Sequence, residues 1–249
     1  MEIAGSTAIV TGAASGLGAA TVAYLASQGA RVYGLDLHPE AAPELDAVTY
    51  LATDVTDADQ VRAAVERAAT SEPLRIVVNC AGIGPSARIV GKRGVHDLDL
   101  YAKVIQINLI GTFNVLALAA EQIAVTEPLE HGARGIIVNT ASVAAYEGQI
   151  GQAAYSSSKA GVVGLTLPAA RDLAQHGIRV NAVAPGIVDT PMLATVSDDF
   201  CAALAAGVPF PQRLCRPDEF AELVGMVVTH DYLNGETIRM DGALRMAPR

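Results

Sequence analysis

The sequence predicts a doubly wound α/β fold, in which a largely parallel sheet of about seven strands carries helices on both faces. Three observations predict it. Short apolar runs alternate with longer helical stretches, a pattern that favours parallel strands joined by right-handed crossovers. Many of these runs are apolar enough for strands buried on both faces. The first run leads through a glycine-rich turn directly into a helical stretch.

The elements can be justified in chain order. The run at 6–11 is short and β-branched, 31–36 ends at an acidic residue, and 75–79 and 135–140 are built around consecutive Ile and Val residues. Strands are predicted near 6–11, 31–36, 48–53, 75–79, 135–140, 178–184 and 236–240. Helices are predicted near 16–28, 57–71, 98–124, 153–175 and 217–230.

No break in composition marks a linker, so we expect one domain over residues 1–249. The stretch 192–217 is apolar and proline-rich around Phe210. We expect it to form either a lid over a substrate or an ordinary surface excursion.

Composition excludes several classes of function. A net charge of −9 argues against general nucleic-acid binding. The longest mostly apolar run, 109–120, is too short to span a bilayer. The first strand begins almost at once, so we expect no signal peptide, no membrane partner and a cytoplasmic location.

The cysteines and histidines favour no metal site. Three widely separated cysteines are best interpreted as free buried thiols, and the five histidines show no metal-ligand spacing. The cysteines are Cys80, Cys201 and Cys215.

The glycine-rich turn after the first strand predicts a site for a dinucleotide pyrophosphate. Backbone N–H groups and a helix N-terminus can hold the phosphates of such a ligand in a Rossmann-type fold. Its spacing, G-x-x-x-G-x-G, differs from the general G-x-G-x-x-G fingerprint, so the turn alone is a weak signal. The expected contacts are Gly12, Ser15, Gly16, Leu17 and Gly18.

Asp36 ends the second strand, eighteen residues after Gly18. A carboxylate at this place can accept hydrogen bonds from an adenosine ribose and would repel a 2′-phosphate. No arginine lies beside it, since Leu37 follows. This favours NAD over NADP, although an ordinary strand-end carboxylate would look the same.

Further small or polar residues follow the other strands, where ligands of such sheets bind. Asp54 and Val55 are expected near the adenine, and the turn after the fourth strand near a ribose. The loop after the sixth strand is expected near the nicotinamide carboxamide and the phosphates. The residues concerned are Asp54, Val55, Cys80, Ala81, Gly82, Pro185, Gly186, Val188 and Thr190.

Tyr155 and Lys159 lie four residues apart in a predicted helix, and Ser142 follows the fifth strand. That spacing places phenol and ammonium on one face of the helix. Alone, the pair is more often a packed ring beside a solvated ammonium. Next to a hydride-carrying cofactor it predicts proton transfer, because a neighbouring ammonium or nicotinamide cation favours the phenolate.

Asn108 interrupts an apolar helical run, and a buried Asn must be hydrogen-bonded. It either ties its helix to a strand or holds a water that relays protons. Both interpretations remain open from the sequence.

Together these motifs resemble the short-chain dehydrogenase/reductase family over nearly the whole chain, from Ile3 to Met246. The resemblance implies that Ser142 polarises a carbonyl, Tyr155 is the acid/base, and Lys159 lowers the tyrosine pKa and binds the nicotinamide ribose. Asn108 would hold the relay water. Cys80 departs from the family, where a second asparagine is frequent, and we expect little consequence.

Three longer segments resemble one branch of that family, the type 2 3-hydroxyacyl-CoA dehydrogenases, also described as 17β-hydroxysteroid dehydrogenase type 10. They are 139–155, 208–214 and 233–243. This resemblance implies NAD-dependent oxidation of (3S)-3-hydroxyacyl-CoA, possible side activity on hydroxysteroids, and a homotetramer. Ser142, Gln152, Tyr155 and Phe210 are the expected substrate contacts.

A cluster of cations, Arg88, Lys92 and Arg93, follows the fourth strand in an otherwise acidic chain. At the rim of the site they would meet CoA phosphates by charge-assisted hydrogen bonds. A solvated basic loop is an equally good interpretation.

Two other functions are weighed against the main prediction. A 3-oxoacyl-carrier-protein reductase has the same fold, but Asp36 argues against the NADPH that reductive biosynthesis usually draws on. A non-catalytic dinucleotide-sensing scaffold is disfavoured, because the proton-transfer residues are all present.

Overall fold

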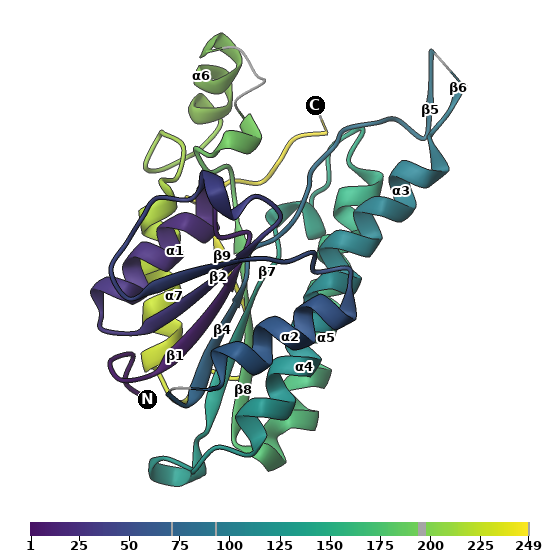
Figure 1. The fold of residues 1–249 in the computed structure, drawn as a ribbon. Helices are drawn as coiled ribbons and strands as arrows, with labels where there is room; N and C mark the ends of the chain where they lie inside the picture. The colour runs from purple at the N-terminus through teal and green to yellow at the C-terminus, as the bar shows by residue number, and fades with distance from the viewer. Residues whose placement is uncertain (71, 93, 194–197, 249) are drawn as a thin grey trace.

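The computed structural model describes residues 1–70, 72–92, 94–193 and 198–248. A seven-stranded sheet with the order β3-β2-β1-β4-β7-β8-β9 forms its centre (Figure 1), and every neighbouring pair is parallel. This confirms the predicted fold class, and each predicted strand bound agrees within one residue. The strands are β1 (Thr7–Thr11), β2 (Arg31–Asp36), β3 (Val48–Ala52), β4 (Leu74–Asn79), β7 (Gly135–Thr140), β8 (Ile178–Pro185) and β9 (Thr237–Met240).

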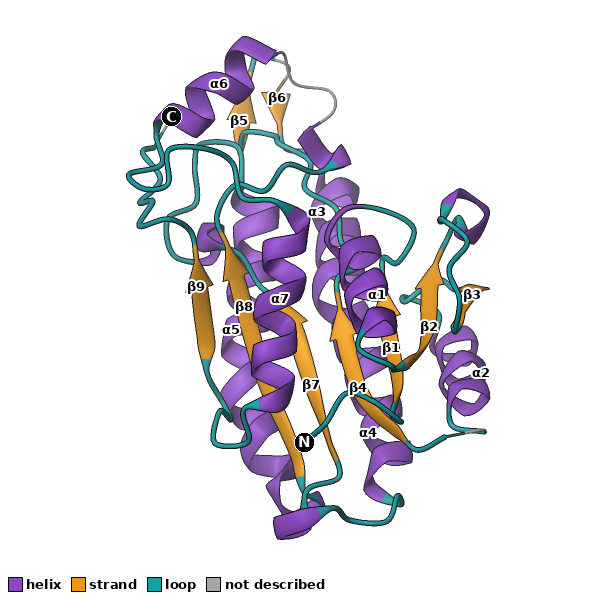
Figure 2. Ribbon diagram, turned by 90° about the vertical axis from the view of Figure 1, so that its left-hand side faces the viewer, coloured by secondary structure: helices purple, strands orange, loops and turns teal. Residues whose placement is uncertain are grey.

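Helices cover both faces of the sheet (Figure 2). One face carries α1 (Gly16–Ser27) and α7 (Pro217–Thr229), and the other carries α2 (Ala58–Ala68), α4 (Thr112–Ala124) and α5 (Ala153–Leu173). Successive strand residues point to opposite faces. Accordingly, Val77 and Ile137 belong to the core under α2, α4 and α5, whereas Val78 and Val138 belong to the core under α1 and α7.

The predicted helix at 98–124 is confirmed, but it is not uniform. It consists of α3 (Leu98–Ile105), a π-helical segment (Gln106–Gly111) and α4. Leu98–Ala124 is long and apolar enough to cross a membrane by length and composition. The sequence did not suggest this, because only the apolar run 109–120 was considered. Val104, Val115 and Ile123 of Leu98–Ala124 are fully buried in the fold, so we assign it as a core helix.

The sequence did not predict two features that project from this body. Strands β5 (Val90–Gly91) and β6 (Gly94–Val95) form an antiparallel hairpin that extends from the sheet (Figure 1). The predicted lid contains a helix, α6 (Asp198–Ala206), and residues 194–197 of that lid lie outside the described residues. Short 3₁₀ turns occur at Pro39–Ala41, Glu130–Gly132, Val143–Ala145, Ala174–His176 and Pro191–Leu193.

All three cysteines are free, as predicted. As whole residues they are only partly buried, although the Cys80 thiol is desolvated enough to raise its pKa. Cys80 directly follows β4. Cys201 and Cys215 belong to α6 and the segment after it, which explains why neither of these two reaches the core.

Candidate active site

The glycine-rich turn between β1 and α1 is shaped by close backbone packing. Gly12 has φ +64°, and a Cβ there would lie 2.9 Å from the backbone of Ala81. A Cβ on Gly18 would overlap the carbonyl oxygen of Gly12. The hydroxyl of Thr11 accepts the N–H groups of Cys80 and Ala81, each at 3.0 Å. The ends of β1 and β4 are thus joined, and the close contacts at Gly12 and at Gly18 both require glycine.

The same turn presents the open N-terminus of α1. Ser15 is the N-cap residue; its side chain caps no backbone group in the described chain, and the first turn holds no acidic residue. The orphan N–H groups and the helix dipole therefore favour an anion here. Gly16, at φ +52°, faces Thr190, since a Cβ on the glycine would lie 3.4 Å from the threonine side chain. This arrangement fits a pyrophosphate between the turn and the loop after β8.

Asp36 faces this turn from the end of β2. One carboxylate oxygen accepts the N–H of Ala14 at 2.9 Å, and the other accepts the N–H of His38 at 3.0 Å. These two bonds fix the carboxylate at the rim of the glycine-rich turn. Leu37 is exposed beside it. The position agrees with the predicted contact to an adenosine ribose.

Asp54 and Val55 lie past the end of β3. The Asp54 carboxylate accepts both the N–H and the hydroxyl of Thr56, at 2.8 and 2.7 Å. The Val55 carbonyl accepts a bond from Asn114, and Gly111 packs directly on the valine side chain. The segment is therefore held against α4, on the side of the sheet where the adenine is expected.

The loop after β8 is anchored to β9 and runs towards the glycine-rich turn. The N–H of Gly186 donates to Met240 at 2.9 Å, and a Cβ on the glycine would lie 3.0 Å from Asp241. Val188 forms a parallel bridge with Cys215. Pro185 and Gly186 are thus anchored to β9, while Val188 and Thr190 continue towards the glycine-rich turn.

Tyr155 and Lys159 lie on one face of α5, as predicted from their spacing. The Lys159 Nζ is 5.8 Å from the centre of the Tyr155 ring and donates to the Thr140 carbonyl at 2.7 Å. Lys159 is 5 % exposed. A Cβ on Gly82 would lie 3.8 Å from this Nζ, so the turn after β4 passes directly over the ammonium.

Burial governs the protonation of both groups. It lowers the pKa of Lys159 to about 8, because the ammonium has lost its hydration. It raises the pKa of Tyr155, and a hydrogen bond with the Ser142 side chain offsets part of that rise. The expectation that Lys159 lowers the tyrosine pKa stays a prediction.

Ser142 begins the loop between β7 and α5 and is buried. Its hydroxyl accepts the N–H of Ala144 at 3.1 Å and so caps the 3₁₀ turn Val143–Ala145. The loop then passes Gly148, where a Cβ would overlap the Ser156 hydroxyl of α5. Ser142 is therefore set by its own turn and by close contact of this loop with the helix that carries Tyr155.

The side chain of Asn108 makes three hydrogen bonds to protein groups. Its oxygen accepts the Ile83 N–H at 2.9 Å, and its nitrogen donates to the Ile83 carbonyl at 2.9 Å and to the Ser158 hydroxyl at 3.0 Å. The geometry supports the structural role that the sequence left open. The relay-water role remains a prediction.

Cys80 stands at the predicted cofactor contact in the turn after β4. Its sulfur accepts a bond from Thr140 at 3.6 Å. Burial raises the pKa of the thiol to about 11, so it stays protonated at neutral pH. Ala81 and Gly82 lie beside the glycine-rich turn and Lys159 respectively, as described above.

The predicted substrate contacts are less closely grouped. The Gln152 side chain accepts the N–H of Gln149 at 2.9 Å, and Phe210 is 82 % exposed with its N–H bonded to Gly242. The sequence missed Met192. A Cβ on Gly84 would lie 3.1 Å from its sulfur and 3.6 Å from the Tyr155 ring, so this methionine stands beside the tyrosine.

Arg88 and Lys92 are exposed on and next to the β5–β6 hairpin, whereas Arg93 lies outside the described residues. The segment is joined to the active-site loop, because Ala87 donates its N–H to the Gly151 carbonyl at 2.8 Å. The two cations therefore lie on the segment that borders the site from the β4 side.

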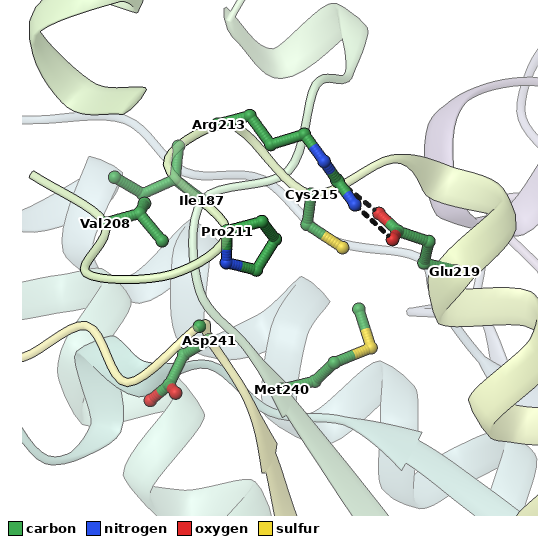
Figure 3. Close-up of a pocket in the computed structure, with 9 residues that line it drawn as sticks. Ile187, Val208, Pro211, Arg213, Cys215, Glu219, Met240 and Asp241 are labelled. Carbon is green, nitrogen blue, oxygen red and sulfur yellow. Dashed lines mark hydrogen bonds and ion pairs between the residues drawn. The ribbon is translucent and has the colours of Figure 1, made fainter. Parts of the chain in front are cut away.

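A cavity of about 140 Å³ lies beneath the base of the lid (Figure 3). Arg213 and Glu219 form a two-pronged ion pair across it, at 2.7 and 2.6 Å, beside Cys215 and Pro211. None of Ser142, Tyr155 and Lys159 lines it. The cavity lies between the base of the predicted lid, at Val208 and Pro211, and Ile187 of the loop after β8.

The Rossmann-type cradle, with the buried Ser142 and Lys159 beside the partly buried Tyr155, is the arrangement expected of a dehydrogenase site. Residues 6–200 match the short chain dehydrogenase family model, and the chain belongs to that family. It is an oxidoreductase.

Several relatives are similar over nearly their whole length. The 3-hydroxyacyl-CoA dehydrogenase type-2 of Drosophila melanogaster is 49% identical, with 99% of this chain and 100% of the relative covered. The human protein of that name is 46% identical over 99% and 98% of the two chains. The crystal structure of 3-hydroxyacyl-CoA dehydrogenase type-2 from Mycobacterium avium superposes with a TM-score of 0.94 at 46% identity, covering 98% of both chains.

Proposed function

We propose that this chain is an NAD-dependent dehydrogenase that interconverts (3S)-3-hydroxyacyl-CoA and 3-oxoacyl-CoA. The placement of Tyr155 beside the buried side chains of Lys159 and Ser142, at the end of a dinucleotide cradle, carries the proposal. The names of the similar proteins support the substrate class.

Bound nicotinamide supplies the hydride acceptor for oxidation. The chain supplies the proton transfer: the Tyr155 oxygen takes the hydroxyl proton as hydride leaves the substrate carbon. Burial opposes the phenolate, so the negative form of Tyr155 needs positive charge nearby. Lys159, protonated below its pKa of about 8, provides one such charge.

Ser142 and Lys159 position the reacting groups. The Ser142 hydroxyl can donate to the substrate oxygen, stabilising the charge that develops there in the transition state. The Lys159 ammonium donates one of its three N–H groups to the Thr140 carbonyl at 2.7 Å. The other two can point towards Tyr155 and towards a ribose hydroxyl.

NAD is the proposed cofactor. The Asp36 carboxylate, fixed by the N–H groups of Ala14 and His38 at the end of β2, supports this choice because it would repel a 2′-phosphate bound there. Two negative charges in close contact repel each other strongly. The exposed Leu37 beside it offers no counter-charge.

The proposed acyl-CoA substrate is supported by Arg88 and Lys92, exposed near the site on the segment bonded to Gly151. Replacing both by Ala should raise KM for an acyl-CoA about fivefold. KM for a small ketone analogue that lacks CoA should not change. An equal rise in both KM values would refute the phosphate contact.

Three alternatives differ from this proposal in substrate or in class of function. A 3-oxoacyl-carrier-protein reductase would prefer NADPH and a carrier-bound thioester, and a hydroxysteroid or secondary alcohol dehydrogenase would keep the mechanism on another substrate. A non-catalytic NAD-sensing scaffold would bind the cofactor without turnover. The fully assembled Ser142, Tyr155 and Lys159 favour an enzyme.

We expect the protein to form a homotetramer. A groove of about 650 Å³ runs between α4 and α5, and its lining is mostly apolar or small. Phe113 is 49 % exposed there, and a second copy of this chain would cover it. Phe113→Glu should therefore reduce the assembly size in sedimentation velocity; an unchanged size would exclude this face.

The test of the proposed function is NADH formation from both enantiomers of 3-hydroxybutyryl-CoA, with NAD⁺ and NADP⁺ compared. The proposal expects turnover of the (S) thioester with NAD⁺. Preference for the (R) thioester would place the chain with (3R)-3-hydroxyacyl-CoA dehydrogenases, of which the human one is 35% identical. Turnover of steroids or simple alcohols alone would discard the thioester.

No nucleic-acid or membrane partner is proposed, in keeping with the net charge of −9. The expected cytoplasmic location stays a prediction, which cell fractionation would test.

A further inference from the structure

Arg239, at the end of β9, is the centre of an ion-pair cluster that also contains Glu147, Asp241 and Arg245. Its guanidinium forms a bidentate ion pair with Glu147, with N···O distances of 2.9 and 2.8 Å, and its Nε donates to Asp241 at 2.8 Å. Arg245 donates to Asp241 at 3.0 Å. We call these four residues the Arg239 cluster.

The cluster is shielded from water more than an ordinary surface pair. The side chains of Arg239, Glu147 and Asp241 are 22 %, 25 % and 8 % exposed. The Arg239 guanidinium also lies 5.3 Å from the centre of the Tyr146 ring, within cation–π range. Planar two-pronged pairing fixes direction as well as distance.

The cluster joins two segments that border the site, the loop after Ser142 and the segment that begins with β9. Glu147 is in the loop that begins at Ser142, and its N–H is bonded to the Val143 carbonyl at 3.0 Å. Asp241 packs on Gly186 of the loop after β8. Figure 3 shows its carboxylate directed away from the Arg213–Glu219 pair, so the two ion-pair groups are separate.

The C-terminal tail completes the arrangement. Ile150 donates its N–H to the Pro248 carbonyl at 3.1 Å, and Gln149 donates to the Ala247 carbonyl at 3.0 Å. Gly242, next to Asp241, accepts the N–H of Phe210 at the base of the lid. The loop after Ser142, the lid base and the tail therefore meet around Arg239.

We propose that Arg239 is a positioning residue, which acts through Glu147 to hold the loop after Ser142 in the geometry that the reaction needs. This inference rests on the proposed function for its kinetic test. The guanidinium touches no reacting group. It acts on the loop, whose contact with α5 at Gly148 and Ser156 is too close to admit a side chain on the glycine.

The predicted effect is on turnover rather than on cofactor binding. A misplacement of about 1 Å near reacting atoms lowers turnover by about 100-fold, so Arg239→Met should lower kcat by about 10- to 100-fold. Affinity for NAD⁺ should stay within about twofold, because the cradle at Gly12 and Asp36 is built from β1, β2 and α1. Arg239→Lys keeps the charge without the two-pronged geometry and should restore only part of kcat.

The experiment compares Arg239→Met, Arg239→Lys and Glu147→Gln with Arg31→Met. Arg31 forms an exposed pair with Glu72 at 3.8 Å at the start of β2, far along the sheet from the site, and its loss should leave kcat unchanged. Hydrogen exchange is measured in parallel. Arg239→Met should speed exchange at the amides of 143–151 and 243–248 and leave α1 protected.

The outcomes separate this inference from the proposed function. Equal kcat for Arg239→Met and Arg31→Met, or unchanged exchange in 143–151, would overturn the positioning role. Uniformly faster exchange, α1 included, in both Arg239 variants would show a general stability effect and also overturn it. Wild-type protein inactive on hydroxyacyl-CoA would refute the proposed function alone, since exchange reports the loop without any substrate.

Discussion

Because the Lys159 ammonium is buried, we expect the free energy of unfolding to depend on pH. Lys159 has a pKa of about 8 in the folded chain, against 10.5 for an unperturbed lysine. The unfolded chain therefore holds this proton more tightly than the folded chain, and folding pays a desolvation penalty while the group is charged. The difference between the two pKa values corresponds to about 3 kcal/mol.

Replacing Lys159 by Met removes this penalty together with one hydrogen bond. The lost bond to the Thr140 carbonyl costs about 1–3 kcal/mol, so the two changes nearly cancel near pH 7. The pH dependence is more diagnostic. The penalty is full below the folded pKa and disappears as pH rises towards 10.5, so wild type should gain about 1 kcal/mol over Lys159→Met between about pH 7 and pH 9.

Urea unfolding of both proteins at the two pH values, at one protein concentration, measures this difference. The variant should also lose most turnover, which separates the role of Lys159 in the reaction from its effect on folding. A free-energy difference between the proteins that does not change with pH would refute the argument that Lys159 is desolvated.

Three further predictions follow from the site. Gly18→Ala should lower the free energy of unfolding by about 1–3 kcal/mol and weaken NAD⁺ binding, because its Cβ would overlap the Gly12 carbonyl; urea unfolding with normal midpoint would contradict this. Asp36→Asn combined with Leu37→Arg should shift the NAD⁺/NADP⁺ preference by about tenfold or more towards NADP⁺ in steady-state kinetics, and an unchanged ratio would remove Asp36 from the ribose site. Asn108→Ala strands the Ile83 backbone groups and should destabilise the fold by about 1–3 kcal/mol, whereas a neutral effect in thermal unfolding would deny its structural role.

The sheet could be predicted from the sequence because its strands are local patterns. Runs such as Ile76-Val77-Val78 and Ile136-Ile137-Val138 bury both faces, so their composition marks them without any knowledge of neighbours. The glycine-rich turn is equally local, since φ and packing at Gly12 demand glycine. The hairpin β5–β6 has two residues in each strand, too few for a pattern.

Parts of the site depend on contacts that no local pattern contains. The pairing of Glu147 with Arg239 joins residues 92 positions apart, and nothing in their spacing marks them. The pKa of Tyr155 depends on how completely the ring is buried, which spacing to Lys159 does not reveal. The three hydrogen bonds of the Asn108 side chain likewise could not be predicted, because they depend on where the fold places Ile83 and Ser158.

The central claim is that Tyr155 transfers the proton in an NAD-dependent oxidation of (3S)-3-hydroxyacyl-CoA. It is tested most directly by the rate of NADH formation from (S)-3-hydroxybutyryl-CoA at saturating NAD⁺, in wild type and Tyr155→Phe. The account predicts turnover in wild type and a loss of about 100-fold or more in the variant. Similar rates in the two proteins would contradict it.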